Sequence, residues 1–265
     1  MPGAPQDLED LADLAERAAR RGGGVVLSGR ARRAERKGAG DYVTEVDRAS
    51  EAAVERMLSR ATPGIPVRGE EGGGEGGERY WLIDPLDGTT NFLHGFPAVG
   101  VSVALIEHGR PVVGAVHAPF LGETYVAVRG RGARMRRRGR PPLVLRVSDR
   151  RPHEAVVGTG FPFRRKEILP RYLRMFAAAL ERFEDLRRPG AASLDLAWVA
   201  AGVFDGFFEL ALAPWDVAAG GLLVEEAGGV VTDWGGGPGY LSGDILAAPP
   251  VVHRSLLELA RATER

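Results

Sequence analysis

Apolar side chains recur at helical spacing near the start of the chain. Between Asp7 and Arg21 they return every three or four positions, which places them on one face of an amphipathic helix. The glycines at 22–24 predict the end of that helix. A second helix is predicted over Asp47–Arg60, and Pro63 ends it. The charged, glycine-containing segment from Arg30 to Gly40 predicts a mobile loop between the two helices.

Short apolar runs separated by turn residues fill the rest of the first half. The glycine-rich segment at 72–77 predicts an exposed loop. The runs that follow it are typical of an antiparallel meander. The predicted strands are Tyr80–Ile83, Val99–Ile106, Val112–Val116 and Thr124–Val128.

Strands and helices alternate in the second half, which indicates an α/β arrangement. The basic, glycine-rich stretch from Arg129 to Pro142 predicts a soft boundary between residues 1–142 and residues 143–265. We expect helices, an antiparallel sheet and most candidate metal ligands in the first part, and an α/β part that completes the site in the second. Predicted helices are Leu169–Arg182, Leu194–Ala201, Val217–Ala227 and Ser255–Thr263, and predicted strands are 156–157, Phe204–Leu210, Val230–Thr232 and Ile245–Ala248.

Composition excludes several classes of function. The chain has 265 residues, 44% of them hydrophobic, which is enough for a substantial core. Lys plus Arg equals Asp plus Glu, 35 each, so net charge favours neither a nucleic-acid nor a membrane partner. The absence of cysteine excludes disulfides, cysteine-ligated zinc and cysteine nucleophiles. No apolar run approaches the ~20 residues of a membrane span, and the polar N-terminus lacks a signal-peptide core, so we expect a cytoplasmic protein.

The most informative motif begins directly after an apolar strand, with Asp84 and Asp87 three residues apart. Pro85 between them favours a turn. Such a turn can bring both carboxylates and the carbonyl of Leu86 towards one point. These hard oxygen ligands are the type that Mg²⁺ selects.

The next two residues of the motif suit a phosphate. Gly88 has no side chain, so an anion can approach the backbone N–H groups. If Thr89 opens a helix, its N–H and the positive helix end favour an anion there. The same residues also occur in ordinary Asp-rich turns, so the motif alone leaves both readings open.

Other acidic positions are candidates to join this site. Glu70 and Glu71 stand just before the glycine-rich loop. Thr44 and Asp47 have the spacing of a hydroxyl and a carboxylate at a helix start, and Asp216 precedes a predicted helix. Each also has a structural reading, because Asp is a common N-cap and paired glutamates are usually solvated.

Four segments, in the right order, resemble the inositol monophosphatase family. They are 41–47 (DYVTEVD), 69–71 (GEE), 84–92 (DPLDGTTNF) and 215–220 (WDVAAG). The resemblance extends over nearly the whole chain, to Ile245–Ala248. It implies an α/β fold, the layered α-β-α-β-α sandwich of the inositol monophosphatase and fructose-1,6-bisphosphatase type. It also implies a Mg²⁺-dependent, lithium-sensitive phosphomonoesterase that forms a homodimer.

The resemblance implies roles for individual residues. Thr89, hydrogen-bonded to Asp47, would orient a water with Glu70, and no covalent phosphoenzyme would form. Two or three Mg²⁺ ions would be bound by Glu70, Asp84, the Leu86 carbonyl, Asp87 and Asp216. The substrate would be contacted by Leu86, Asp87, Gly88, Thr89, Gly190, Ala191, Ala192, Glu209 and Asp216.

Within the family, the segment after Thr90 is most similar to the branch that hydrolyses inositol 1-phosphate or related small sugar and polyol phosphates. A fructose-1,6-bisphosphatase or dual activity stays open. Ser193 stands where alanine is frequent, and Pro249-Pro250 also departs from the pattern. We expect neither departure to touch the metal ligands. His94 has no chemical role in the family pattern, so we expect a structural one.

Three other classes of function were weighed. A haloacid-dehalogenase-type phosphatase is disfavoured because Asp84 and Asp87 are three residues apart rather than two. A scaffold that lost catalysis is disfavoured because every implied ligand is present. The dense basic run Arg129–Arg140 is an alternative RNA- or protein-binding element. We favour a solvated hairpin there, since a charge run is usually a solvated face and this one lacks aromatics for stacking bases.

Overall fold

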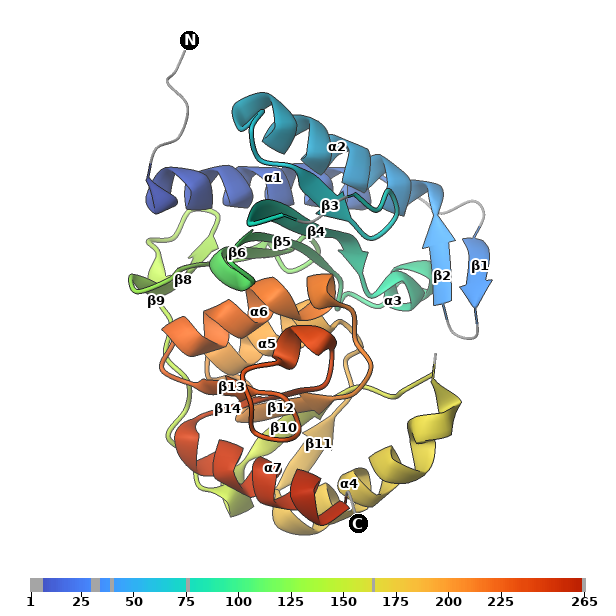
Figure 1. Cartoon of the computed structure of the whole chain (residues 1–265), viewed down its shortest axis with the longest axis vertical. Helices are drawn as coiled ribbons and strands as arrows, with labels where there is room; N and C mark the ends of the chain where they lie inside the picture. Colours follow the sequence, from blue (N-terminus) through green and yellow to red (C-terminus); the bar gives the residue numbers. More distant parts are fainter. Residues whose placement is uncertain (1–6, 30–33, 39–40, 75–76, 164, 264–265) are drawn as a thin grey trace.

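The computed structural model describes residues 7–29, 34–38, 41–74, 77–163 and 165–263. Helices and sheets alternate in five layers (Figure 1), which confirms the predicted α-β-α-β-α sandwich. Among the described residues, no helix is both long and apolar enough to cross a membrane. The helical layers are α1 (Leu8–Ser28) with α2 (Glu45–Ala61), α5 (Ala192–Ala200) with α6 (Pro214–Glu226), and α4 (Leu169–Arg182) with α7 (Pro250–Thr263).

The first sheet has seven strands in chain order and is antiparallel except for the parallel pair β3 and β4. It contains the predicted meander. It also continues into the basic stretch after Arg129, where β8 adds a strand. The strands are β3 (Val67–Gly69), β4 (Arg79–Asp87), β5 (Gly100–Glu107), β6 (Arg110–Ala118), β7 (Glu123–Val128), β8 (Gly132–Arg137) and β9 (Leu143–Val144).

Successive side chains along each strand of this sheet point to opposite faces, so the apolar ones contribute to two separate cores. On β4, Trp81 and Ile83 pack with α1 and α2, whereas Leu82 packs towards α5 and α6. All three side chains are buried. The sheet is therefore covered by helices on both faces, and its strand ends are held between rigid layers.

The second sheet has the strand order β11-β10-β12-β14-β13 and mixes parallel and antiparallel pairs. Its outer face packs on α4 and α7 through a third apolar core. The predicted alternation of strand and helix is confirmed here. The strands are β10 (Val156–Thr159), β11 (Asp185–Arg187), β12 (Gly206–Glu209), β13 (Val230–Thr232) and β14 (Ile245–Ala248). Short 3₁₀ helices span Pro152–Glu154, Lys166–Ile168 and Tyr240–Ser242.

The predicted end of the first helix is wrong. Helix α1 runs through Gly22 and Gly23 to Ser28. A Cβ on Gly22 would lie 2.7 Å from the Ser50 Oγ of α2, and one on Gly23 would lie 2.3 Å from the His117 ring of β6. Glycine costs about 1 kcal/mol in a helix, but here it permits close packing, so tertiary contact overrides the local signal.

The segment predicted as a mobile loop between Arg30 and Gly40 contains a strand. β1 (Ala34–Gly38) pairs antiparallel with β2 (Asp41–Thr44), which leads directly into α2. Residues 30–33 and 39–40 of that prediction lie outside the described residues. Figure 1 shows this hairpin beside the short helix α3 (Thr89–His94), at one edge of the first sheet.

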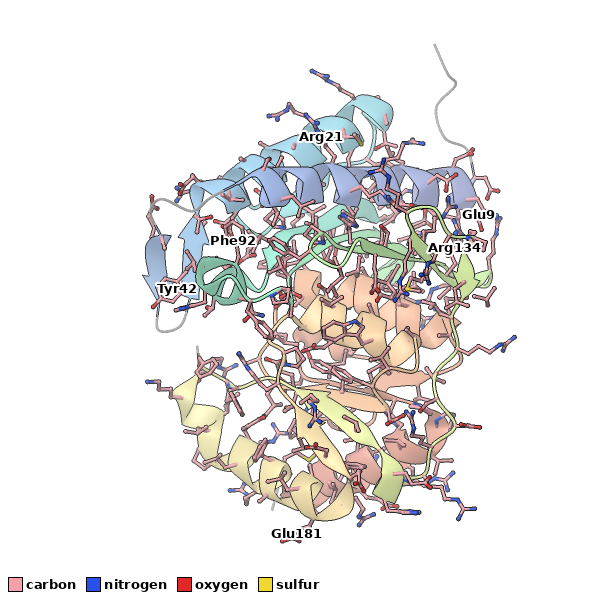
Figure 2. All side chains as sticks on the ribbon, turned by 180° about the vertical axis from the view of Figure 1, so that it is seen from behind. Glu9, Arg21, Tyr42, Phe92, Arg134 and Glu181 are labelled. Atoms are coloured by element: carbon pink, nitrogen blue, oxygen red, sulfur yellow. The ribbon has the colours of Figure 1, made fainter. Side chains whose placement is uncertain are left out.

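The arginines of the basic stretch are largely paired within the chain. Figure 2 shows Arg134 beside Glu9, because β8 and its turns lie along the first helix. The carboxylate partners come from α1 and its N-cap, from α6 and from β7. The ion pairs are Arg129–Glu225 (2.8 Å), Arg131–Asp7 (2.8 Å), Arg134–Glu9 (3.2 Å), Arg136–Glu16 (3.2 Å) and Arg137–Glu123.

Candidate active site

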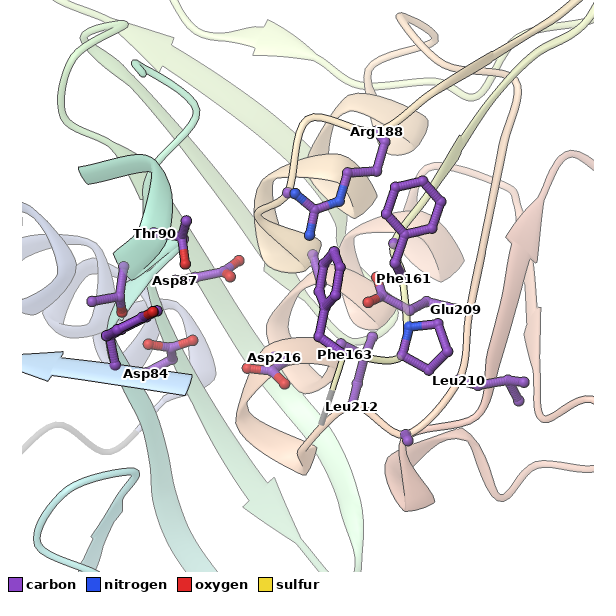
Figure 3. Close-up of a pocket in the computed structure, with 18 of the residues that line it drawn as sticks. Asp84, Asp87, Thr90, Phe161, Phe163, Arg188, Glu209, Leu210, Leu212 and Asp216 are labelled. Carbon is purple, nitrogen blue, oxygen red and sulfur yellow. The ribbon is translucent and has the colours of Figure 1, made fainter. Parts of the chain in front are cut away.

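Three aspartates meet where the first sheet faces α6. Asp84 and Asp87 stand at the end of β4, and the register between β4 and β5 shifts between them. Asp216 lies in the first turn of α6. One carboxylate oxygen from each lies within 4.8 Å of the others, and Figure 3 shows all three pointing towards one space. A bulge in β4 at Pro85 and Leu86, rather than the predicted turn, places Asp84 and Asp87 together. The start of α6 brings Asp216 to them from the second half of the chain.

Burial and neighbouring negative charge raise the pKa of Asp84 and of Asp87. Burial, followed by the negative charges of Glu70, Asp87 and Asp216, raises the pKa of Asp84 well above its usual value. Burial and the charge of Asp216 raise the pKa of Asp87 to about 7. Like charges at such distances disfavour ionisation unless a cation lies between them. The donor set consists of hard oxygens, which fits Mg²⁺.

Asp216 is positioned by the start of α6 and not as the N-cap. Its Oδ2 accepts a hydrogen bond from the Ala213 N–H at 2.7 Å, so it stands at the third helical position. The carbonyl of the preceding Trp215 accepts from the Ser102 hydroxyl of β5 at 3.2 Å. The carboxylate of Asp216 therefore both accepts a hydrogen bond at the start of α6 and belongs to the acidic cluster. The structural and the metal-binding interpretations of Asp216 are compatible.

Asp47 and Thr89 are hydrogen-bonded, as expected. The Thr89 hydroxyl donates to Asp47 Oδ1 at 3.0 Å, with the Leu86 carbonyl oxygen 3.2 Å away. The other oxygen of Asp47 accepts from the backbone N–H of Thr44, the actual N-cap of α2, at 2.9 Å. Burial raises the pKa of Asp47, and these hydrogen bonds oppose the shift. Asp47 lies behind Thr89 and does not line the cavity.

The glycine at 88 has the conformation that its proposed role needs. Its φ is 89°, in the left-handed region, and it directly precedes α3. A Cβ there would lie 2.9 Å from the Ala98 carbonyl oxygen and 3.3 Å from the Ala191 Cβ. A side chain at this position is excluded by strain and by the packing against Ala98 and Ala191, so this part of the cavity lining requires glycine.

Ser193 contacts a candidate metal ligand, contrary to our expectation. Both its backbone N–H and its hydroxyl donate to Asp87 Oδ2, at 2.7 and 2.6 Å. The prediction that this residue does not touch the candidate ligands is therefore wrong. The bonds link α5 to the end of β4 across 106 positions. They also leave the other oxygen, Asp87 Oδ1, to face the cluster.

Sequence reasoning also missed Glu51, which holds the loop that carries Glu70. Its carboxylate accepts from the backbone N–H of Glu71 at 2.9 Å and of Gly72 at 2.5 Å. A Cβ on Gly69 would lie 2.5 Å from the same carboxylate. Glu51 stands one helical turn after Asp47 on α2, and that spacing is the only signal in the sequence that points to it.

A cavity of about 360 Å³ extends from the acidic cluster towards β12. Most of the predicted substrate residues line it. Ala191 does not, since its methyl group packs behind the turn at Gly88. His94 is exposed at the end of α3. The predicted residues that line the cavity are Glu70, Asp84, Leu86, Asp87, Gly88, Thr89, Gly190, Ala192, Glu209 and Asp216.

The side of the cavity opposite the cluster carries three side chains that sequence reasoning missed. Arg188 reaches over the rings of Phe161 and Phe163, and Figure 3 shows all three beside Glu209. No motif in the sequence singles them out, because the two phenylalanines and the arginine come from different segments. The loop of Arg188 is tied to α3 by Asn91, whose side-chain amide donates to the Pro189 carbonyl at 2.8 Å.

Comparison with known proteins gives consistent results. Residues 7–265 match the inositol monophosphatase family. A Nus factor SuhB from Pseudomonas aeruginosa is 45% identical, over 94% of this chain and 95% of that protein. The solved structure of the extragenic suppressor protein suhB from Bartonella henselae has a TM-score of 0.89 at 36% identity, over 95% of this chain and 98% of that one. An IMPase from Thermotoga maritima has a TM-score of 0.86 at 32% identity, over 96% and 98%.

Proposed function

The chain belongs to the inositol monophosphatase family, and from this premise we propose that it is a Mg²⁺-dependent phosphomonoesterase. Its proposed substrate is inositol 1-phosphate or a related small sugar or polyol phosphate. The observation that carries the proposal is the convergence of Asp84, Asp87 and Asp216, whose oxygens lie within 4.8 Å of one another. Three mutually repelling carboxylates at the end of a cavity need a cation, and a phosphate ester needs the same cation.

Two or three Mg²⁺ ions would be held by the three aspartates, Glu70 and the Leu86 carbonyl. When bound, they would lower the pKa of a water and stabilise the departing alkoxide. The protein's own part is positioning. Thr89, held by Asp47 at 3.0 Å, turns its oxygen towards the reacting water, and Glu70 accepts a hydrogen bond from that water. The water oxygen would bond to phosphorus while the ester P–O bond breaks. The attacking water would release one proton, and the departing alkoxide would take up one proton from solvent to leave as the alcohol.

The remaining cavity residues would recognise the substrate. The N–H groups at Gly88 and Thr89 would bind the phosphate, since both residues line the cavity. Gly190, Ala192 and Glu209 line the same cavity further along and would contact the alcohol. A volume of about 360 Å³ suits a sugar-sized ligand.

The test is phosphate release by the purified protein, with Mg²⁺ and with a chelator. The substrates are inositol 1-phosphate, fructose 1,6-bisphosphate and 3′-phosphoadenosine 5′-phosphate. We expect Mg²⁺-dependent release led by inositol 1-phosphate. Faster release from another ester would support the phosphomonoesterase assignment but contradict inositol 1-phosphate as the preferred substrate. No release from any of them would reject the phosphatase assignment.

A regulatory role is a second candidate, because the Pseudomonas aeruginosa relative is named a Nus factor. The chain's basic stretch is the surface that we considered for RNA or protein binding. Five of its arginines already meet carboxylates of the same chain, which weakens it as a polyanion site. RNA binding with a steep salt dependence would support this second role. The family resemblance also leads us to propose a homodimer, which sedimentation would test.

A further inference from the structure

Three polar side chains share one face of helix α2 and are buried there. Asp47, Ser50 and Glu51 stand at positions i, i+3 and i+4, which lie next to one another on a helix surface. The face of a helix that packs on a sheet is normally apolar, and a polar group buried there is costly unless it is hydrogen-bonded. The partners of these three side chains therefore indicate why the polar face is kept.

Asp47 and Ser50 hold the segment at the end of β4. The Thr89 hydroxyl donates to Asp47 Oδ1 at 3.0 Å. The Ser50 hydroxyl donates to the carbonyl oxygen of Pro85 at 2.8 Å, within the bulge of β4. A Cβ on Gly22 would lie 2.7 Å from the Ser50 Oγ, so α1 approaches closely behind that side chain. One helix thereby holds both the bulge that places the aspartates and the threonine that follows it.

Glu51 holds a different segment, the loop that carries Glu70. This loop follows β3, which lies beneath α2 in Figure 1. Both carboxylate oxygens are used, since Oε2 accepts from the Glu71 N–H at 2.9 Å and Oε1 accepts from the Gly72 N–H at 2.5 Å. A Cβ on Gly69 would lie 2.5 Å from Oε2, so the loop packs closely against the carboxylate. The backbone on either side of Glu70 is therefore fixed against Glu51.

We propose that Glu51 is a positioning residue for Glu70, so that α2 acts as a common frame for the two groups that would orient the attacking water. Thr89 is held by Asp47, and Glu70 is held through Glu51 one helical turn later. Residues one turn apart on a helix keep a fixed separation, so the two water-orienting groups are fixed relative to each other. This inference rests on the proposed phosphatase function and adds a residue to its machinery.

The test compares Glu51→Gln with Glu55→Gln, an exposed change one turn further along α2. Glutamine has the same size but only one acceptor oxygen, so it cannot accept from both N–H groups of the loop. For each protein, kcat and KM are measured with Mg²⁺ on whichever of the three esters named above the wild type hydrolyses fastest. We expect Glu51→Gln to lower kcat by about tenfold to a hundredfold, because a misplaced group costs that much, while KM changes by less than about twofold. Glu55→Gln should leave both constants unchanged.

Two further variants separate positioning from a general loss of stability. Gly69→Ala keeps the carboxylate but places a methyl group against it, so it should lower kcat in the same way and gives the same test if Glu51→Gln does not fold.

In a Glu70→Gln background, Glu51→Gln should lower kcat by less than about a further twofold, because its effect passes through Glu70. Circular dichroism checks that each variant is folded. A kcat like wild type in folded Glu51→Gln and Gly69→Ala would overturn the proposal and leave the phosphatase function intact. So would an equal loss of kcat from Glu51→Gln in the two backgrounds. Wild-type protein that releases phosphate from none of the esters with Mg²⁺ would overturn both.

Discussion

Two regions of this molecule concentrate charge of one sign, and the fold treats them in opposite ways. In the basic stretch after Val128, five arginines each meet a carboxylate brought in from α1, α6 or β7. At the end of β4, the fold instead brings Asp84 and Asp87 against Asp216, which carries the same charge. In the first region, the positive charges are paired with carboxylates of the same chain. The second is the one for which we propose a bound cation.

The energetic consequences differ in the same way. Exposed ion pairs contribute only ~0–1 kcal/mol each, so the basic stretch docks on α1 without depending on any single pair. Buried like charges are unfavourable, and the pKa of Asp87 is raised to about 7 for that reason. Density of charge in a sequence therefore does not mark a functional site. Like charges that the fold buries together do.

The largest effect is expected from Asp87→Asn. This change removes one carboxylate from the cluster and keeps its shape, and turnover should fall by at least about a hundredfold. The folded state should remain, because the amide can still accept from Ser193. Steady-state kinetics and circular dichroism check the two parts. Asp10→Asn, an exposed change on α1, is the control. Activity like wild type in Asp87→Asn would contradict the metal assignment.

Mg²⁺ should also stabilise the fold, because it binds the native cluster and not the unfolded chain. At a hundred times its dissociation constant, a ligand adds about 2.7 kcal/mol, which a thermal melt resolves readily. Asp87→Asn should melt higher than wild type without metal and gain less from Mg²⁺. A gain of equal size in both proteins would place the ion elsewhere.

Local patterns predicted most of the fold. The meander and the α/β half follow from alternation and helical spacing, and both were confirmed. The end of α1 was predicted wrongly, because the packing of Gly22 and Gly23 against α2 and β6 cannot be derived from the helix itself. The strand β1 was missed because its residues are charged and lack an apolar repeat.

The candidate site also has features that local sequence patterns predict and features that they do not. Asp84 and Asp87 belong to one short motif, so their proximity could be predicted, although a bulge in β4 produces it and not the turn expected from Pro85. Contacts across long stretches of sequence could not. Ser193 binds Asp87 from 106 positions away, and Arg188 meets its two rings because it follows β11, which pairs with β10, the strand that precedes both phenylalanines. The sequence resemblance supplied the proposed ligand set, whereas the hydrogen bonds that orient it required the structure.

A smaller effect is expected from Glu209→Ala. Glu209 is a carboxylate that lines the cavity beyond the cluster, so its removal should change binding of the alcohol more than the chemistry on phosphorus. We expect the ratio of kcat/KM between inositol 1-phosphate and glycerol 2-phosphate to fall about tenfold, with turnover of the smaller ester changed less. A ratio that stays at the wild-type value would remove Glu209 from the substrate contacts.

The smallest effect is expected in the basic stretch, from Arg136→Gln. This side chain contacts Glu16 at 3.2 Å and Asp13 at 3.6 Å on α1. Losing these contacts should lower the free energy of unfolding by about 0.5–1 kcal/mol, and salt should narrow the difference from wild type. Arg138→Gln, an exposed change on the same hairpin, is the matched control and should have no effect. Both variants should keep wild-type kcat/KM, since the hairpin lies away from the cavity. The opposite result is a loss of activity in Arg136→Gln although the protein still folds and Mg²⁺ still raises its melting temperature. That result would contradict the contrast between the two regions, in which the basic stretch is paired within the chain and only the acidic cluster serves catalysis.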